Sequence, residues 1–359
     1  MENNFSKIIA ISVSGIGNTV LFTPFLSALR KKFPQAEVDI LVWNEGMSDA
    51  VSGGKLVDNI FIFPKNFFKK IILILKLRKR KYDCSVVAFP SNKWQFNALV
   101  FLIGAKERIT HSYAFGKIRT LSFLQNRKIR AIEGIHDVDQ DMNLLAAFGV
   151  SPESEGKKLS FFVSDGDRAF AEKFLNENGI GNMALMGIHP GAGRENDKSL
   201  LGEAKRWPAE NFSKLCDKII EKKNYFILVF GGPGENNVKE EVKKLSKYKE
   251  KILVINQPLK KTAALIERCG LFVSNDSGLM HIAAALEVPT VGIFGPVDYR
   301  RVRPYGEKCL AVSDHNCKPI FKYPFHSTSA KINLEEGLKC LENIKVENVL
   351  EAVERITKL

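Results

Sequence analysis

Cysteine is sparse in this sequence. Six cysteines occur among 359 residues, and no two of them form a Cys-x-x-Cys pair. Secreted disulfide scaffolds are dense in cysteine, and zinc sites and redox motifs use closely spaced pairs, so this usage argues against all three. Cys309, His315 and Cys317 lie near one another in the chain, but their spacing matches no usual set of zinc ligands. We therefore expect reduced thiols and a cytoplasmic protein.

Long apolar runs are also missing. A helix that spans a membrane needs about 20 apolar residues in succession, whereas the nearest candidate, residues 71–75, is short and has lysines on both sides. Residues 1–14 contain Glu2 and Lys7 and lead directly into a glycine turn, which favours a first strand over a secretory leader. We expect neither a membrane span nor a leader.

Acidic residues are too few to balance the basic ones. Lysine and arginine total 53 against 40 aspartates and glutamates, which gives a net charge of +13 at pH 7. A surplus of this size favours an anionic partner, such as nucleotide phosphates, an acidic lipid surface or nucleic acid. We expect no nucleic-acid partner, because the lysines are not interleaved with aromatic residues as in a known binding module.

Strands and helices alternate along both halves of the chain. Apolar runs predict buried strands at residues 7–13, 37–42, 59–63, 83–89, 184–188, 226–230, 252–255, 271–273, 290–294 and 309–312. This alternation predicts an α/β fold with a parallel sheet in each half, and a length of 359 residues suits two domains. The polar stretch 151–158 contains proline and glycine and predicts the start of the connection between the domains.

The stretch at residues 271–296 organises the second half. It predicts a buried strand, a polar turn, a short helix near Gly278 and a second buried strand. The turn therefore lies at the carboxyl end of a strand, where open α/β sheets bind ligands. The first N–H groups of a helix have no partner inside it and carry partial positive charge, so they favour a phosphate group. Gly278 allows such a group to approach the backbone closely.

Side chains around this turn add further polar groups. Ser277 and His281 are four residues apart, so they share one face of the helix, next to Asp276. We predict a phosphate-binding site made of Asp276, Ser277, Gly278 and His281. The alternative is that Asp276 or Ser277 only caps the helix and that His281 is an ordinary, partly buried side chain.

Three other glycine turns follow predicted strands. Gly15 and Gly17 follow the first strand, and such a turn by itself indicates little more than a tight connection. Gly191 and Ala192 lie in a loop whose N–H groups can surround a diphosphate, although an ordinary strand–helix turn has the same composition. Glu235 ends the third turn, where a carboxylate can hold ribose hydroxyls or simply stabilise the first turn of a helix.

These motifs resemble those of glycosyltransferase family 9, the heptosyltransferase family of lipopolysaccharide assembly. Residues 276–296, D-S-G-x-x-H-x-A-A-A-L-x-x-P-T-x-x-x-F-G-P, resemble its C-terminal signature. The first glycine turn is followed by an apolar run, Pro24 and Ala-Leu-Arg at residues 28–30, as in the N-terminal motif of the family. The resemblance covers nearly the whole chain.

The resemblance implies the GT-B architecture, in which two Rossmann-like domains with parallel sheets face a central cleft. We expect an N-terminal acceptor domain over residues 1–155 and a C-terminal nucleotide-sugar donor domain over residues 156–345. A final helix over residues 346–359 is expected to pack back towards the N-terminal domain. The K-x-W-P pattern implies that Lys205 meets the phosphates of the donor. By analogy alone, the segment around Gln257 borders the base.

One catalytic position departs from the family pattern. The aspartate that is thought to act as general base in the family is Asn18 here, and an amide cannot accept a proton at neutral pH. Asn18 can therefore orient an acceptor hydroxyl without deprotonating it. The segment H-x-V-D resembles one in the family, which makes His136 or Asp139 a candidate substitute base, although acidic residues also suit the start of a helix.

The resemblance implies an inverting, metal-independent glycosyltransferase without a cofactor. The expected substrates are a nucleotide-diphospho-sugar, foremost ADP-heptose, and a lipopolysaccharide core at the cytoplasmic face of the inner membrane. Three alternatives stay open: a family 9 transferase with another donor and another glycan acceptor, a nucleotide-sugar epimerase on the same fold, and a nucleotide-sugar-binding protein with weak or no transfer because of Asn18.

Residues 66–81 predict a basic helix with a broad apolar face. Such a helix either covers the sheet, with its lysines in solvent, or rests on an anionic membrane surface. For the apolar residues we favour the first interpretation. For the basic cluster at residues 78–81 the two interpretations carry nearly equal weight.

Overall fold

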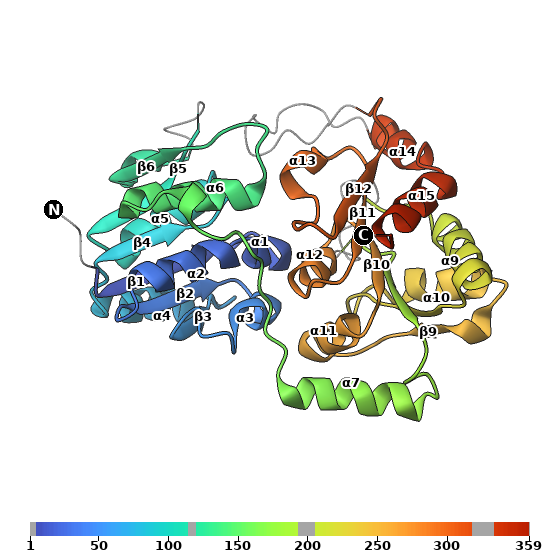
Figure 1. Cartoon of the computed structure of the whole chain (residues 1–359). Helices are drawn as coiled ribbons and strands as arrows, with labels where there is room; N and C mark the ends of the chain where they lie inside the picture. Colours follow the sequence, from blue (N-terminus) through green and yellow to red (C-terminus); the bar gives the residue numbers. More distant parts are fainter. Residues whose placement is uncertain (1–4, 114–119, 193–204, 318–333, 359) are drawn as a thin grey trace. The chain divides into compact units, whose positions relative to one another are not determined.

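The computed structural model describes residues 5–113, 120–192, 205–317 and 334–358 (Figure 1). Contacts within the chain divide it into two compact units, and the boundary in the sequence lies between Phe162 and Val163. Each unit is built on its own six-stranded parallel sheet. The predicted α/β class with two Rossmann-like domains is therefore confirmed, while the cleft between them stays a prediction.

The sheet of the first unit has the order β3-β2-β1-β4-β5-β6. Its strands are β1 (Lys7–Ser12), β2 (Glu37–Val42), β3 (Asn59–Ile62), β4 (Cys84–Val87), β5 (Glu107–Ser112) and β6 (Arg127–Arg130). β1 pairs with β2 on one side and β4 on the other, and all but its first residue are buried, as expected for a central parallel strand covered on both faces.

Helices connect these strands (Figure 1). They are α1 (Ile16–Leu21), α2 (Thr23–Lys32), α3 (Glu45–Val51), α4 (Phe67–Lys79), α5 (Trp94–Ile103) and α6 (Asp137–Asn143), with 3₁₀ turns η1 (Ser122–Leu124), η2 (Leu144–Phe148) and η3 (Pro152–Ser154). Asn44 and Asn66 begin α3 and α4, because each amide oxygen accepts a hydrogen bond from an N–H of the first turn. Pro24 lies in the first turn of α2, where its missing N–H costs nothing.

The sheet of the second unit has the order β12-β11-β10-β7-β8-β9. Its strands are β7 (Leu185–His189), β8 (Phe226–Val229), β9 (Ile252–Val254), β10 (Leu271–Asn275), β11 (Thr290–Phe294) and β12 (Cys309–Ser313). Its helices are α7 (Asp165–Glu177), α9 (Ala209–Lys223), α10 (Asn236–Leu245), α11 (Leu259–Glu267), α12 (Gly278–Ala285), α13 (Tyr299–Val302), α14 (Leu334–Glu342) and α15 (Val346–Ile356), with the 3₁₀ turn η4 (Lys249–Lys251). Both sheets place their first and fourth strands side by side, which is the doubly wound topology.

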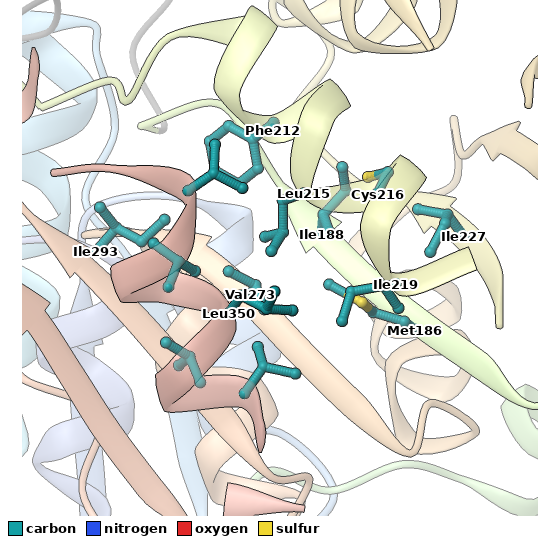
Figure 2. Packing of buried hydrophobic residues seen from close by; sticks show 14 of the residues in the cluster. Met186, Ile188, Phe212, Leu215, Cys216, Ile219, Ile227, Val273, Ile293 and Leu350 are labelled. Carbon is teal, nitrogen blue, oxygen red and sulfur yellow. The ribbon is translucent and has the colours of Figure 1, made fainter. Parts of the chain in front are cut away.

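A buried apolar cluster joins one face of the second sheet to the helices that cover it. Figure 2 shows Ile188 of β7, Leu215 of α9 and Val273 of β10 among its side chains. Leu350 and Val353 bring α15 into the same cluster. The buried side of α15 therefore lies in the core of the second unit, and its packing towards the N-terminal domain stays a prediction.

The boundary between the units lies beyond the predicted residue 155. The segment that follows residue 155 is held on the first unit, where Leu159 and Phe161 are buried. The N–H of Ser160 donates to Oγ1 of Thr23 at 3.0 Å. Polar composition correctly indicates the connection but not how far the chain stays attached to the first sheet.

Strands β5 and β6 were not predicted, because their sequences ERITHS and RKIR are polar and charged. Parallel pairing of β5 with β4, and of β6 with β5, places them in the sheet despite this composition. The charged side chains of β6 are tolerated because it is an edge strand with exposed residues at every second position.

The expectation of six reduced thiols is also corrected. Cys317 and Cys340 form a disulfide with an S–S distance of 2.02 Å. They lie 23 positions apart in the sequence, and only the fold brings their Cα atoms to 5.4 Å. Cys84, Cys216 and Cys269 are free and buried, as is Cys309, where burial raises the pKa of the thiol to about 12.

The position of α15 predicts a large effect of truncating its buried side. Leu350→Ala should lower the free energy of unfolding by about 2–5 kcal/mol, because it leaves a cavity in the apolar cluster. Glu351→Ala, on the exposed side of the same helix, should change it by less than about 0.5 kcal/mol. Urea denaturation followed by tryptophan fluorescence measures both, and equal small changes would show that α15 is not part of this core.

Candidate functional site

The carboxyl ends of three neighbouring strands bring the glycine turns of the second unit together. β7 pairs with β10, with Ser274 opposite His189, and with β8, with Ile188 opposite Val229. In parallel strands the following loops leave from one edge of the sheet. The turns after His189, after Val229 and at residues 276–278 therefore start at the same edge, as the sequence predicts.

Asn275, the last residue of β10, cross-links the segments at this edge. Its buried amide nitrogen donates to the carbonyl oxygens of Pro190 at 2.7 Å and Gly191 at 3.3 Å. Its amide oxygen accepts from the N–H of Trp207 at 3.1 Å. Sequence reasoning treated Asn275 only as part of a polar turn, although a polar residue that ends an apolar strand was the available signal.

Ser277 caps α12. Its Oγ accepts from the N–H of Met280 at 3.3 Å, and it lies 2.8 Å from Nδ1 of His189. The hydroxyl is buried, so the structure supports the capping role that was the alternative for Ser277. Gly278, by contrast, is the first residue of α12, where a backbone N–H has no partner within the helix.

A buried histidine–carboxylate pair lies behind the capping serine. Nε2 of His189 is 3.0 Å from Oε2 of Glu235, which also accepts from the N–H of Gly232 at 2.6 Å. Glu235 is 2% exposed. These contacts give Glu235 a structural role between two turns, and its contact with a ribose stays a prediction. Sequence reasoning did not single out the side chain of His189.

The position of the Glu235 carboxylate requires a glycine at residue 191. A Cβ atom at position 191 would lie 2.0 Å from Oε1 of Glu235. The glycine therefore allows the loop after β7 to pass directly over a buried carboxylate. Ala192, the next residue, is partly exposed, and the contact of either residue with a diphosphate stays a prediction.

Lys205 forms an ion pair at the start of α12. Its Nζ donates to Oδ2 of Asp276 at 2.6 Å, and both side chains are less than one third exposed, at 29% and 12%. The pair places an ammonium group beside the helix N-terminus. The predicted residues Lys205 and Asp276 are thus brought together, with Asp276 holding the lysine.

His281 adds a neutral imidazole to this site. Burial lowers its pKa to about 4, with Lys205 acting in the same direction and Asp276 opposing it. The ring is therefore uncharged at pH 7. Its Nδ1 is buried without a hydrogen-bond partner in the structure, which is unusual for a polar atom.

The remaining predicted binding residues lie at other strand ends. Gln257 follows β9, and its carbonyl oxygen accepts from Oγ1 of Thr262 at 2.9 Å. In the first unit, Gly15 has a φ of 143° and precedes α1, which contains Gly17 and Asn18. Asn18 is partly exposed. Roles of these residues towards a ligand stay predictions.

The two candidate substitute bases are both engaged. Nδ1 of His136 accepts from the N–H of Val138 at 3.1 Å, which makes it the cap of α6. Oδ1 of Asp139 is 2.6 Å from Nζ of Lys157. The alternative that these residues stabilise the start of a helix is therefore supported for His136, and a role in proton transfer stays a prediction for both.

Asp141 is a carboxyl group that sequence reasoning passed over. It is 1% exposed and accepts from the N–H of Phe89 at 2.7 Å. Burial raises its pKa well above the ordinary value, although the bond from Phe89 opposes this, and the neighbouring Asp137 raises it further. Its signal in the sequence was a third acidic residue on the inward side of α6.

Two absences concern only the residues that the structure describes. Among them, no group of three or more His, Cys, Asp or Glu side chains is arranged to hold a metal ion. The grouping of Cys309, His315 and Cys317 does not form a site, since Cys317 is in the disulfide. None of the described helices has the length and apolar character that crossing a membrane requires.

Comparisons with known proteins agree with these motifs. The sequence model of glycosyltransferase family 9 (heptosyltransferase) matches residues 71–329. The chain is 34% identical over 323 residues to lipooligosaccharide heptosyltransferase 2 of Haemophilus ducreyi, which covers 85% of this chain and 88% of that protein. It is 26% identical over 351 residues to lipooligosaccharide heptosyltransferase 2 of Campylobacter jejuni, which covers 96% of each. The solved structure of E. coli ADP-heptose lipopolysaccharide heptosyltransferase II shares the fold, with a TM-score of 0.75, 21% identity and 98% of each chain covered.

The close packing of Gly191 against the carboxylate of Glu235 leads to a specific prediction about stability. Gly191→Ala should destabilise the protein by roughly 1–3 kcal/mol, because Glu235 is held by His189 and Gly232 and cannot move aside cheaply. Gly156→Ala is the matched control, since nothing lies within 4 Å of its Cβ position, and it should be neutral or slightly stabilising. Thermal and urea denaturation compare the two, and a neutral Gly191→Ala would contradict this packing.

Proposed function

The chain belongs to glycosyltransferase family 9, and from this membership we propose that it transfers heptose from ADP-heptose to a lipopolysaccharide core, with inversion at the anomeric carbon and without a metal ion. It is a glycosyltransferase. The relatives named above are called lipooligosaccharide heptosyltransferases, which supports the choice of sugar and acceptor class. The proposed place of work is the cytoplasmic face of the inner membrane.

One observation carries the proposal. At the start of α12, the ammonium group of Lys205 and the unpartnered Nδ1 of His281 accompany the first N–H groups of a helix. Helix N-termini favour anions, and lysine adds a full positive charge. This combination suits a diphosphate better than a neutral sugar, so we assign this edge of the second unit to the nucleotide diphosphate.

The same groups can assist departure of the nucleotide. When the bond between the anomeric carbon and the phosphate oxygen breaks, negative charge develops on the diphosphate. Hydrogen-bond donors that already point to that charge stabilise the transition state without reorganisation. Lys205 would shift from Asp276 towards the phosphate, while neutral His281 could contribute a single N–H or a lone pair.

A second candidate function follows from Asn18. An amide cannot remove a proton from the acceptor hydroxyl, and the candidate substitutes His136 and Asp139 are already engaged. A protein that binds the nucleotide-sugar but transfers it slowly or not at all is therefore the second candidate. It shares the donor site of the first and differs only in turnover.

The diphosphate assignment predicts loss of affinity on removal of its charged group. Lys205→Met should weaken ADP binding at least about tenfold, because a charge-assisted hydrogen bond contributes about 1.5–3 kcal/mol. His281→Ala should weaken it as well. Lys214→Met, an exposed lysine of α9, is the matched control and should not change it. Calorimetry with ADP, UDP and GDP measures affinity and nucleotide preference, and unchanged ADP affinity in both site variants would refute the assignment.

The departure at Asn18 predicts the effect of restoring a carboxylate. Asn18→Asp should preserve or raise the rate of transfer from ADP-heptose to a lipopolysaccharide core, because the new side chain can accept a proton. ADP affinity should stay unchanged in the same variant. Abolished transfer with intact ADP binding would show that the amide itself is needed, and absence of turnover in both proteins would favour the binding-protein alternative.

A further inference from the structure

Helix α4 exposes an unusual amount of apolar surface. Five of its side chains are between 42% and 73% exposed, namely Phe67, Phe68, Ile71, Ile72 and Leu75. Of its 13 residues only Leu77 is fully buried. Isolated exposed apolar residues need no explanation, whereas a contiguous set on one helix marks an interaction surface. We call these five side chains the α4 face.

The helix has two apolar sides that point in different directions. Leu77 is part of the core beneath the helix, and Leu73 and Ile74 pack against that core. Phe68, Ile72 and Leu75 follow the spacing i, i+4 and i+7, so they share the opposite, exposed side. The preferred interpretation from the sequence, in which the apolar residues cover the sheet, holds only for the first side.

Basic residues surround the α4 face. No acidic residue occurs between residues 59 and 82, and that stretch contains Lys65, Lys69, Lys70, Lys76, Arg78, Lys79, Arg80 and Lys81. Arg80 is occupied by structure, since it pairs with Glu37 and Asp39. Lys69, Lys76 and Lys79 are exposed. A partner for this surface must therefore combine negative charge with an apolar region into which these side chains can insert.

Aromatic side chains extend the surface at the carboxyl edge of the sheet. α4 begins soon after β3, so Phe67 and Phe68 lie near that edge. Trp43, which follows β2 and is 44% exposed, stacks on Phe63 with ring centroids 4.9 Å apart. Nζ of Lys70 lies 5.6 Å from the ring of Phe63. Aromatic rings beside lysines are typical of the membrane–water interface.

We propose that the α4 face, together with Trp43, binds the surface of an anionic lipid bilayer, with α4 lying in the interfacial plane. Amphipathic helices bind in this way when apolar side chains enter the acyl boundary and lysines meet acidic headgroups. A protein groove would satisfy the apolar side chains but would need acidic residues all around its rim. The bilayer supplies both at once, which makes it the better match.

This inference goes beyond the proposed function, because it concerns a surface distant in sequence from the predicted binding turns and requires neither nucleotide nor acceptor. If both proposals hold, the carboxyl edge of the first sheet is held at the membrane, where a lipid-linked acceptor is found. Failure of one leaves the other testable, since vesicle binding and ADP binding are separate measurements on the same protein.

Vesicle flotation of the full chain tests the proposal. The wild-type protein should bind vesicles of phosphatidylcholine with about one third phosphatidylglycerol much more strongly than pure phosphatidylcholine vesicles, and added salt should weaken this binding. Phe68→Ser with Ile72→Ser should lower the partition coefficient at least about tenfold, because two exposed apolar anchors are lost. Lys69→Glu with Lys76→Glu should do the same by reversing two charges.

Matched controls distinguish binding through the α4 face from nonspecific binding of exposed apolar or basic side chains. Met183→Ser with Leu245→Ser removes two side chains that are 50% and 45% exposed on the second unit. Lys244→Glu with Lys249→Glu reverses two exposed lysines there. Both controls should bind vesicles like the wild type, and all four double variants should keep wild-type ADP affinity, which shows that they are folded.

Two results would overturn the proposal. One is a wild-type protein that does not bind the anionic vesicles, or α4 variants that bind them as well as the wild type does. The other is sedimentation velocity showing a dimer that Phe68→Ser with Ile72→Ser dissociates, together with no vesicle binding, which would assign the α4 face to a second copy of the chain.

Discussion

The buried amide of Asn275 is the contact on which the geometry of the candidate site depends. It holds the loop after β7 through Pro190 and the start of α9 through the N–H of Trp207. Because Trp207 is fixed at the end of β10, Lys205 can reach Asp276, the residue that follows Asn275. A single side chain thus sets the position of a cation that lies far from it in the sequence. Such a buried and fully used amide is costly to replace, because its partners would remain unsatisfied.

Two polar pairs lie one behind the other at this site. The inner one is the pair of His189 and Glu235, which is buried behind the capping serine and braces two turns. The outer one is the pair of Lys205 and Asp276 beside the neutral ring of His281. An arriving phosphate would therefore compete with Asp276 for a lysine that is already in place. The attraction for the phosphate then rests on the helix N-terminus and the freed ammonium group, and not on a large excess of positive charge.

Much of this arrangement could be predicted from the sequence because parallel strands in a covered sheet are continuous apolar runs, and their carboxyl ends are marked by glycine turns. The polar strands β5 and β6 could not be found in that way, since only the pairing of β5 with β4 and of β6 with β5 places them in the sheet. The disulfide and the packing of α15 depend on distant segments that meet only in the fold. The side chain of His189 and the amide of Asn275 face inward, and periodicity does not distinguish an inward polar side chain from one that faces a ligand.

Helix α4 is a second case in which sequence composition does not predict which side chains are buried. Its sequence is apolar on nearly every face, so composition alone favours burial, yet a helix can present only one side to a sheet. The surplus apolar residues must then remain in solvent or meet another surface. Exposing these apolar side chains to water is unfavourable in free energy, and only a partner that covers them offsets this. The many lysines around them make most protein surfaces poor partners. If both proposals hold, basic residues serve two different anions: those of α4 meet a lipid surface, and Lys205 in the second unit meets a nucleotide diphosphate.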